Sequence, residues 1–385
     1  MKIALGMIIK SLDSDAILMN FISNAEKYGH KIDSVIVAYT HKLDAHAAQK
    51  LSEKIEFIAV NINDPGYSRE QFRNRGISDK TTQTLLKCPI DTTAGQVPYG
   101  YNRNIVLIEA LLREIDILFF VDSDVYPTTL KMTSEGPTGF DTDFFGAHLE
   151  YLNSGSEITT GEYSGYNILP PATFDGMEDL LEGVQKADML EYWKTSESHR
   201  CLAVRPPKPE IVPCTKILGG NSAIKLRAFS RLPPFFSSHY TLDNELFLCR
   251  GEDTVLGIGI KKSGITCTDI CNYPLHDTYK DYPKEPNLIG DPATQNRFYY
   301  ACTGWVGRNP FLNYLLDKDL KITREYQREK LIPGLSALAQ YTSNPRYDSV
   351  IRNFDASWNS LKRYIEEYEQ ILDAWAEFTE RMEFK

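Results

Sequence analysis

The residues with the clearest chemical meaning form a short acidic turn, Asp122-Ser123-Asp124. The run before them, Ile117–Val121, is wholly apolar and of strand length, which predicts a β-strand buried on both faces. In an open α/β sheet the ligand crevice lies at the carboxyl ends of the strands, so we expect both carboxylates there. Carboxylates at i and i+2 can converge on one hard divalent cation, which is commonly shared with substrate phosphates. The alternative is a solvated turn, because Asp and Ser are ordinary turn residues.

Two further segments carry residue types that suit a ligand site. One contains Gly219-Gly220-Asn221, whose glycines allow the backbone to approach a ligand closely. The other is Gly251-Glu252-Asp253, which precedes a helix predicted over Thr254–Lys262 and stopped by Gly264. Both segments therefore place polar groups beside predicted secondary-structure elements.

A helix is predicted directly before the acidic strand, from Tyr99 through Arg113, because its apolar residues recur at helical spacing. Asn102, Arg103 and Asn104 lie at its amino end, where free N–H groups and the helix dipole favour an anion. An asparagine that merely caps the helix would account for Asn102 but not for Arg103.

Strand and helix patterns alternate through the first part of the chain. Strands are predicted at Ile3–Ile9, Ile32–Tyr39, Ile55–Ile62, Phe144–Tyr151 and Ile265–Ile270, and helices at Ser14–Tyr28 and Leu43–Lys54. This alternation implies a mostly parallel sheet.

No glycine-rich fingerprint follows the first strand, which argues against a dinucleotide-binding fold. We also expect a polar loop at Asp64–Gln96 and a helix at Met177–Trp193, inside a long irregular insertion.

The amino-acid composition of the chain argues against some classes of binding partner. The formal net charge of −10 argues against nucleic acid or an anionic membrane, so an anionic substrate needs a local basic cluster or a bound cation. Seven scattered cysteines without a CxxC pair indicate neither a zinc site nor a disulfide framework and suit a reducing cytoplasm. Cys267 and Cys271 are predicted to be small buried fillers. We expect no membrane span, because no apolar run approaches about 20 residues.

From about Trp305 onward, the sequence pattern predicts helices and no strands. One helix is predicted over Trp358–Met382, and its apolar seam comprises Trp358, Leu361, Ile365, Tyr368, Leu372, Trp375 and Met382. Its polar face is mainly acidic, so we expect it to dock on its own domain or on a second copy of the chain, as a homo-oligomer.

Together, the strand ending in Asp122-Ser123-Asp124, the Gly219–Ile224 segment and Gly251-Glu252-Asp253 resemble the nucleotide-sugar glycosyltransferases of the GT-A fold, most of all the inverting family 2. The resemblance covers roughly residues 1–280. It implies an α/β, Rossmann-like, mostly parallel sheet flanked by helices, with a C-terminal helical appendage. The implied domains are 1–305, divided into a nucleotide-binding half (1–125) and an acceptor and catalytic half (126–305), and a helical region at 306–385.

The resemblance also implies roles for single residues. Asp122 and Asp124, with His276 beyond the last strand, would hold Mn²⁺ or Mg²⁺ at the donor diphosphate. Asp253 would be the general base that activates an acceptor hydroxyl, and Glu252 would position the acceptor or the donor sugar. The donor-binding positions would be Ile9, Tyr39, Arg103, Asp122, Ser123, Asp124, Gly219, Gly220 and Asn221. For His276, a purely structural part is the alternative.

The nucleobase stays open. The second predicted strand ends at Tyr39-Thr40-His41, without the acidic residue that family members commonly use to recognise the base, and Tyr39 is the residue that could stack on it instead. We expect a UDP- or GDP-sugar as donor and a small molecule or glycan as acceptor. A retaining transferase on the same fold, or a non-catalytic protein that binds sugar nucleotides or polysaccharide, are the alternatives.

Overall fold

The computed structural model describes residues 1–385 apart from residues 94, 135, 191–216, 383 and 385. Its centre is a seven-stranded sheet with the order β12-β8-β9-β4-β1-β2-β3. The strands are β1 (Ile3–Leu12), β2 (Ser34–Leu43), β3 (Glu56–Asn61), β4 (Ile117–Asp122), β8 (Ile158–Gly161), β9 (Asn221–Lys225) and β12 (Cys267–Ile270). All neighbouring pairs are parallel except those of β9, which runs antiparallel to β4 and β8. The predicted mostly parallel sheet is confirmed.

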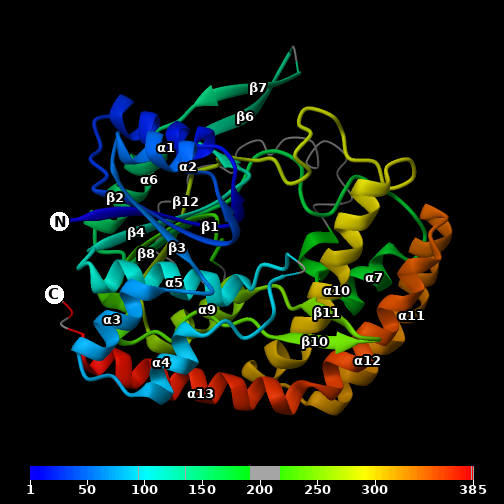
Figure 1. The fold of residues 1–385 in the computed structure, drawn as a ribbon. Helices are drawn as coiled ribbons and strands as arrows, with labels where there is room; N and C mark the ends of the chain where they lie inside the picture. Colours follow the sequence, from blue (N-terminus) through cyan, green and yellow to red (C-terminus); the bar gives the residue numbers. More distant parts are fainter. Residues whose placement is uncertain (94, 135, 191–216, 383, 385) are drawn as a thin grey trace.

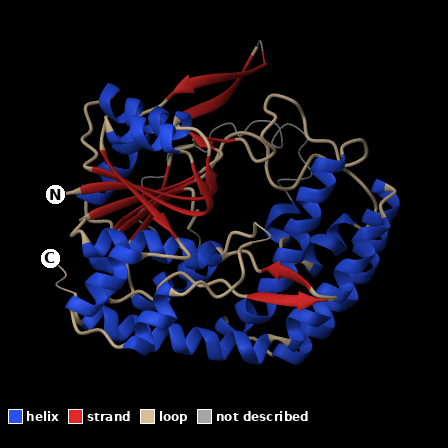
Figure 2. Cartoon of the chain, viewed as in Figure 1, coloured by secondary structure: helices blue, strands red, loops and turns tan. Residues whose placement is uncertain are grey.

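Helices cover both faces of this sheet (Figures 1 and 2). They are α1 (Ala16–Lys27), α2 (Ala45–Ser52), α3 (Gly66–Asn74), α4 (Asp79–Leu86), α5 (Tyr99–Leu112), α6 (Phe144–Asn153) and α9 (Glu252–Ser263). Alternate residues of a strand enter different cores: Phe119 packs with α1 and α6, and Phe120 packs with α5. Burial on both faces explains why β4 reads as an unbroken apolar run.

A second group of helices lies beside the sheet, on the right in Figure 1. It contains α7 (Met177–Gly183), α10 (Pro292–Leu315), α11 (Leu320–Thr342) and α12 (Val350–Asn359), with a hairpin of β10 (His239–Leu242) and β11 (Glu245–Leu248). These elements share their own core, which includes Tyr240, Phe298, Trp305 and Tyr347. The expected C-terminal helical appendage is therefore present. Residue 305 lies inside α10, and the division of the chain there stays a prediction.

The last helix, α13 (Leu361–Glu380), returns from this group to the sheet. The rings of Phe378 and Phe72 stack with centroids 5.0 Å apart, and Trp375 Nε1 donates a hydrogen bond to the Leu232 carbonyl oxygen at 3.1 Å. The predicted apolar seam thus docks within its own chain. The single helix predicted over Trp358–Met382 is wrong, because α12 ends at Asn359 and a new helix begins at Leu361.

Three other expectations need correction. Phe144–Tyr151 is helix α6 and not a strand: the Asp143 carboxylate accepts a hydrogen bond from Gly146 N–H at 2.8 Å and starts the helix. The expected loop Asp64–Gln96 contains helices α3 and α4. Cys267 is buried, but Cys271 is exposed.

Some predicted features fall partly or wholly outside the described residues. In the predicted helix Met177–Trp193, α7 ends at Gly183, a short 3₁₀ turn covers Ala187–Met189, and residues 191–193 lie in the undescribed range. Cys201 and Cys214 lie in that range too. Within the described part of the chain, no helix is long and apolar enough to cross a membrane.

Two short strand pairs follow the acidic turn. β5 (Val125–Tyr126) pairs with β13 (Leu275–His276), and β6 (Thr128–Thr133) forms a hairpin with β7 (Gly136–Asp141) that projects from the top of the molecule in Figure 1. The first of these pairs matters most for the site, because it ties the end of β4 to a segment about 150 residues later in the chain.

Candidate active site

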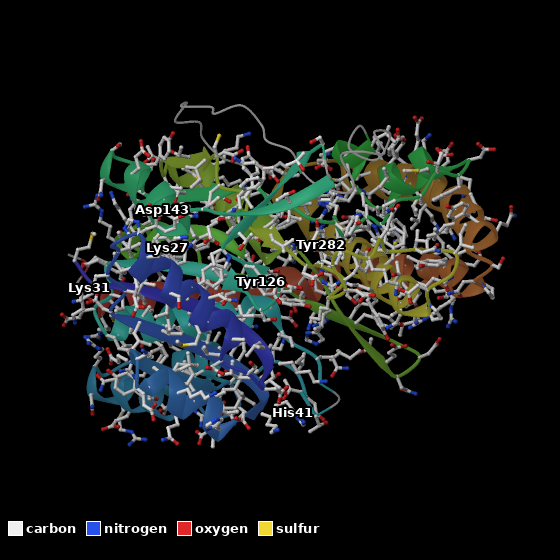
Figure 3. All side chains as sticks on the ribbon, turned by 90° about the horizontal axis from the view of Figure 1, so that it is seen from above. Lys27, Lys31, His41, Tyr126, Asp143 and Tyr282 are labelled. Atoms are coloured by element: carbon white, nitrogen blue, oxygen red, sulfur yellow. The ribbon has the colours of Figure 1, made fainter. Side chains whose placement is uncertain are left out.

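Asp124 lies in the turn after β4, and the pairing of β5 with β13 places His276 beside it. His276 stands opposite Val125, and Asp277 N–H donates to the Asp124 carbonyl oxygen at 2.8 Å. His276 Nε2 lies 3.2 Å from Asp124 Oδ1, and Arg297 Nη2 of α10 lies 3.5 Å from Asp124 Oδ2. Segments distant in sequence therefore meet at one carboxylate. Tyr126, two residues after Asp124, lies near the middle of the molecule as seen from above (Figure 3).

The Asp124 carboxyl is held in its charged form. Only 14% of its side chain is exposed, and burial alone raises its pKa. The charge of His276 and its hydrogen bond, followed by the charge of Arg297, outweigh burial and hold the pKa of Asp124 below its ordinary value. Asp124 is consequently a carboxylate at neutral pH, which is the form that binds hard cations.

Arg103 links three parts of the site from the first turns of α5. It is 2% exposed, and its Nη2 lies 2.9 Å from Asp122 Oδ1 while its Nε lies 3.0 Å from Glu252 Oε1. Its Nη1 donates to the Gly219 carbonyl oxygen at 2.9 Å. The guanidinium thus compensates two carboxylates in a buried setting, where an unpaired charge would be costly. Its predicted contact with the donor stays a prediction.

Gly219 and Gly220 are needed because protein groups approach them closely. A Cβ at Gly219 would lie 2.3 Å from Arg103 Nη2, and one at Gly220 would lie 2.5 Å from Asp122 Oδ2. Gly220 N–H also donates to the Tyr163 hydroxyl at 3.0 Å. The close approach predicted for these glycines is present, and in this structure its partners are the side chains of the site itself.

Glu252 and Asp253 open helix α9, after Gly251 with a φ of +91°. Burial and the neighbouring charge of Asp253 raise the pKa of Glu252, and Arg103 opposes this shift. Asp253 is half-buried, and its Oδ1 accepts a hydrogen bond from Thr254 N–H at 2.6 Å. Because α9 starts at this point, its acidic residues face the positive end of the helix dipole.

Tyr163 is a partly buried residue of the site whose hydroxyl accepts the Gly220 N–H bond and is influenced by the acidic residues. Burial raises its pKa well above the ordinary value, and the charges of Asp122, Asp253 and Asp124 add to the shift, while Arg103 opposes it. Its ring also contacts the ring of His276, with centroids 4.6 Å apart and the ring planes at 49° to each other. Asp122 is close to the same hydroxyl, because a Cβ at Gly220 would lie 2.5 Å from Asp122 Oδ2 and 2.7 Å from the Tyr163 oxygen. The sequence reading did not single out Tyr163.

The remaining donor-site candidates lie along the same edge of the sheet. Ile9 and Tyr39 are register partners near the carboxyl ends of β1 and β2, and both are half-buried, as is Ser123 in the acidic turn. Asn221 is fully buried: its Nδ2 donates to the Glu162 and Asn272 carbonyl oxygens at 2.7 and 3.0 Å. These bonds fix the backbone next to Tyr163, and a direct contact of Asn221 with the donor stays a prediction.

The predicted metal set is only partly assembled. Across the residues that the structure describes, no group of three or more His, Cys, Asp and Glu side chains is close enough to hold a metal ion. Asp124 and His276 are adjacent, whereas Asp122 turns one oxygen to Arg103. A carboxylate oxygen with an imidazole nitrogen is a donor set that suits Mn²⁺. Two protein ligands fit a cation whose remaining positions are filled by phosphate oxygens and water.

Sequence reading missed Tyr163, Arg297 and Arg308. Arg297 and Arg308 had a usable signal, because they are the basic residues of an otherwise largely buried helix, α10. Tyr163 had no such signal in the sequence, because it follows β8 in a short polar segment like many others in the chain.

No family model matches the chain, and no curated protein matches it. Among solved structures, it is similar to glucosyl-3-phosphoglycerate synthase from Mycobacterium tuberculosis in complex with Mn²⁺, UDP-glucose and phosphoglyceric acid, at 12% identity and a TM-score of 0.39, over 82% of this chain and 80% of that one. It is also similar to S. aureus TarS 1-349, at 11% identity and a TM-score of 0.39, over 100% of this chain and 93% of that one.

Proposed function

We propose that the chain is a metal-dependent glycosyltransferase of the GT-A type, which moves a sugar from a nucleotide-sugar donor to an acceptor hydroxyl. The observation that carries this proposal is a set of contacts at the carboxyl end of β4: Arg103 pairs with both Asp122 and Glu252, and His276 lies beside Asp124. These residues come from separate segments, and their sequence motifs were the ones that resembled this enzyme class. The site lies at the carboxyl end of β4, where an open α/β sheet binds its ligand.

The donor half of the site would be formed by Asp124 and His276 as ligands of Mn²⁺ or Mg²⁺. The cation would neutralise charge on the diphosphate leaving group. Asp122 would line the same side of the site, and its Oδ1 is held by Arg103 Nη2 at 2.9 Å. The exposed parts of Ile9 and Tyr39 offer an apolar and an aromatic surface to the nucleoside, which we take to be uridine or guanosine.

The acceptor half would use Asp253 as general base. Asp253 would take the proton of the acceptor hydroxyl as that oxygen attacks the anomeric carbon, and a single displacement of this kind inverts the configuration. One oxygen of Asp253 is held by Thr254 N–H, which fixes the orientation of the carboxylate. Glu252, fixed by Arg103 at 3.0 Å, would position the reacting sugar or Asp253 itself.

Three broader assignments accompany this proposal. The scattered cysteines support a cytoplasmic location. The chain would divide near residue 305, and any homo-oligomer through α13 would use the part of that helix that is not already packed against Phe72 and Leu232.

Asp124→Asn is expected to abolish Mn²⁺-dependent binding of UDP and GDP, measured by isothermal titration calorimetry. An amide is a much poorer ligand for a hard cation than a carboxylate. His276→Ala should weaken the same binding by about tenfold. Asp243→Asn, at an exposed residue paired with Arg352, is the matched control and should behave as wild type. Undiminished nucleotide affinity in a folded Asp124→Asn protein would remove the metal site from the proposal.

A further inference from the structure

Arg250, Arg297 and Arg308 lie along one side of α10, and the function proposed above leaves Arg250 and Arg308 without a task. Arg297 and Arg308 are 11 positions apart, which is three helical turns or about 16 Å, so they share a face. Arg250 contacts the helix between them: its backbone N–H donates to the Gly304 carbonyl oxygen at 3.1 Å. A Cβ at Gly304 would lie 2.3 Å from Arg250 Cγ, so the glycine makes room for this side chain.

Arg308 is buried with little compensation. It is 8% exposed, and Nη2 makes a long 3.4 Å hydrogen bond to the Gln185 carbonyl oxygen. Its Nε has no hydrogen-bond partner among the described residues. Burial lowers the pKa of Arg308 to about 10, and the charges of Asp253 and Asp188 oppose this, so the guanidinium is still charged at neutral pH. Among the residues that the structure describes, this buried cation has one long hydrogen bond for its five donors, which is costly unless an anion completes it.

The two ends of this basic face point at different parts of the site. Arg297 contacts Asp124 at 3.5 Å, on the side assigned to the cation and the donor. Arg308 lies at the start of α9: a Cβ on Gly251 would be 3.0 Å from Arg308 Nη1, and the charge of Asp253 acts on Arg308. Arg250 directly precedes Gly251. Arg250 and Arg308 therefore both lie beside Gly251, two residues before the proposed general base.

We propose that Arg308 and Arg250 bind an anionic group of the acceptor, a phosphate or a carboxylate, and so hold its hydroxyl toward Asp253. This inference rests on the proposed function, because it assigns the acceptor class of the same site. A guanidinium fork matches both anions and can bind either one bidentately. In a chain of net charge −10, such a local cluster is what an anionic substrate requires.

The probes for this site are inorganic phosphate and acetate, titrated calorimetrically at constant ionic strength into the full-length protein. Wild type should bind at least one of them, and Arg308→Gln and Arg250→Gln should each weaken that binding at least about tenfold, as expected for loss of a charged hydrogen-bond partner. Arg352→Gln, at an exposed arginine paired with Asp243, should leave it unchanged. Tighter phosphate binding assigns a phosphorylated acceptor, and equal or tighter acetate binding assigns a carboxylate.

Arg250 is only half-buried, so Arg250→Gln decides the question if Arg308→Gln does not fold. Absence of binding to wild type, or equal binding by the folded variants, overturns the inference.

A second titration contains Mg²⁺ and saturating UDP or GDP. Phosphate that still binds supports an acceptor subsite, whereas phosphate displaced by the nucleotide belongs to the donor diphosphate position and overturns the assignment. Arginine-dependent phosphate binding without any nucleotide binding would instead refute the transferase and retain the anion site.

Discussion

Asp253→Asn is expected to lower the rate of sugar transfer by about 10²–10⁴ while the donor dissociation constant changes by no more than a few-fold. The reason is that a general base acts as the new bond forms, so its charge matters in the transition state and hardly in donor binding. The variant should also fold normally. Asparagine keeps the side-chain oxygen that accepts the hydrogen bond from Thr254 N–H.

Two readouts check this expectation. Rates and donor affinities are compared with those of Asp243→Asn, which removes an exposed carboxylate paired with Arg352, away from the site. The anomeric configuration of the product is determined by NMR, since one displacement must invert it. Near-normal turnover of Asp253→Asn, or a product with the configuration of the donor, contradicts the inverting mechanism and favours retention.

Arg103→Met is expected to lower the free energy of unfolding by about 3–5 kcal/mol, the range measured when one partner of a buried ion pair is removed. Arg103 compensates Glu252 at 3.0 Å and Asp122 at 2.9 Å, and its own side chain is 3% exposed. Without it, Glu252 would remain buried next to the charge of Asp253. Methionine fills much of the same volume, so the loss reports on charge more than on packing.

The measurement is urea unfolding of the variant beside Arg352→Met, whose partner Asp243 is exposed and whose loss should cost less than about 1 kcal/mol. Adding Glu252→Leu to Arg103→Met should recover part of the stability, because the carboxylate left without its cation is then gone. If Arg103→Met is as stable as the surface variant, the central role of Arg103 in the site is wrong.

Local patterns were sufficient to predict much of the sheet. β4 with its acidic turn and helix α5 match the predicted bounds within one residue, as expected from an apolar run and from helical spacing. Helix α9 ends beside its predicted glycine stop but begins at Glu252, two residues before the predicted start at Thr254. α6 differs from the predicted strand because the Asp143 side chain caps a helix there, whereas consecutive aromatic residues favour strands. The expected loop of 33 residues at Asp64–Gln96 was itself too long for a compact domain.

Other features depend on contacts that a single sequence does not encode locally. The reversed direction of β9 follows from its pairing with β4 and β8 and leaves no periodic trace in its residues. His276 meets Asp124 because β13 pairs with β5, and Arg103 turns from a helix end into the core to meet Glu252. Long-range pairing and charge compensation thus decided how the candidate residues meet, after their motifs had identified them.

The central claim, that this chain binds a nucleotide-sugar through a cation at Asp124 and His276, is tested most directly by a thermal-shift panel. UDP-, GDP-, CMP- and dTDP-sugars are compared with and without Mn²⁺, because a ligand that binds only the folded state raises its melting temperature. We predict that UDP- or GDP-sugars raise it only when Mn²⁺ is present. No shift with any nucleotide-sugar, or a shift of equal size without a divalent cation, would contradict the account.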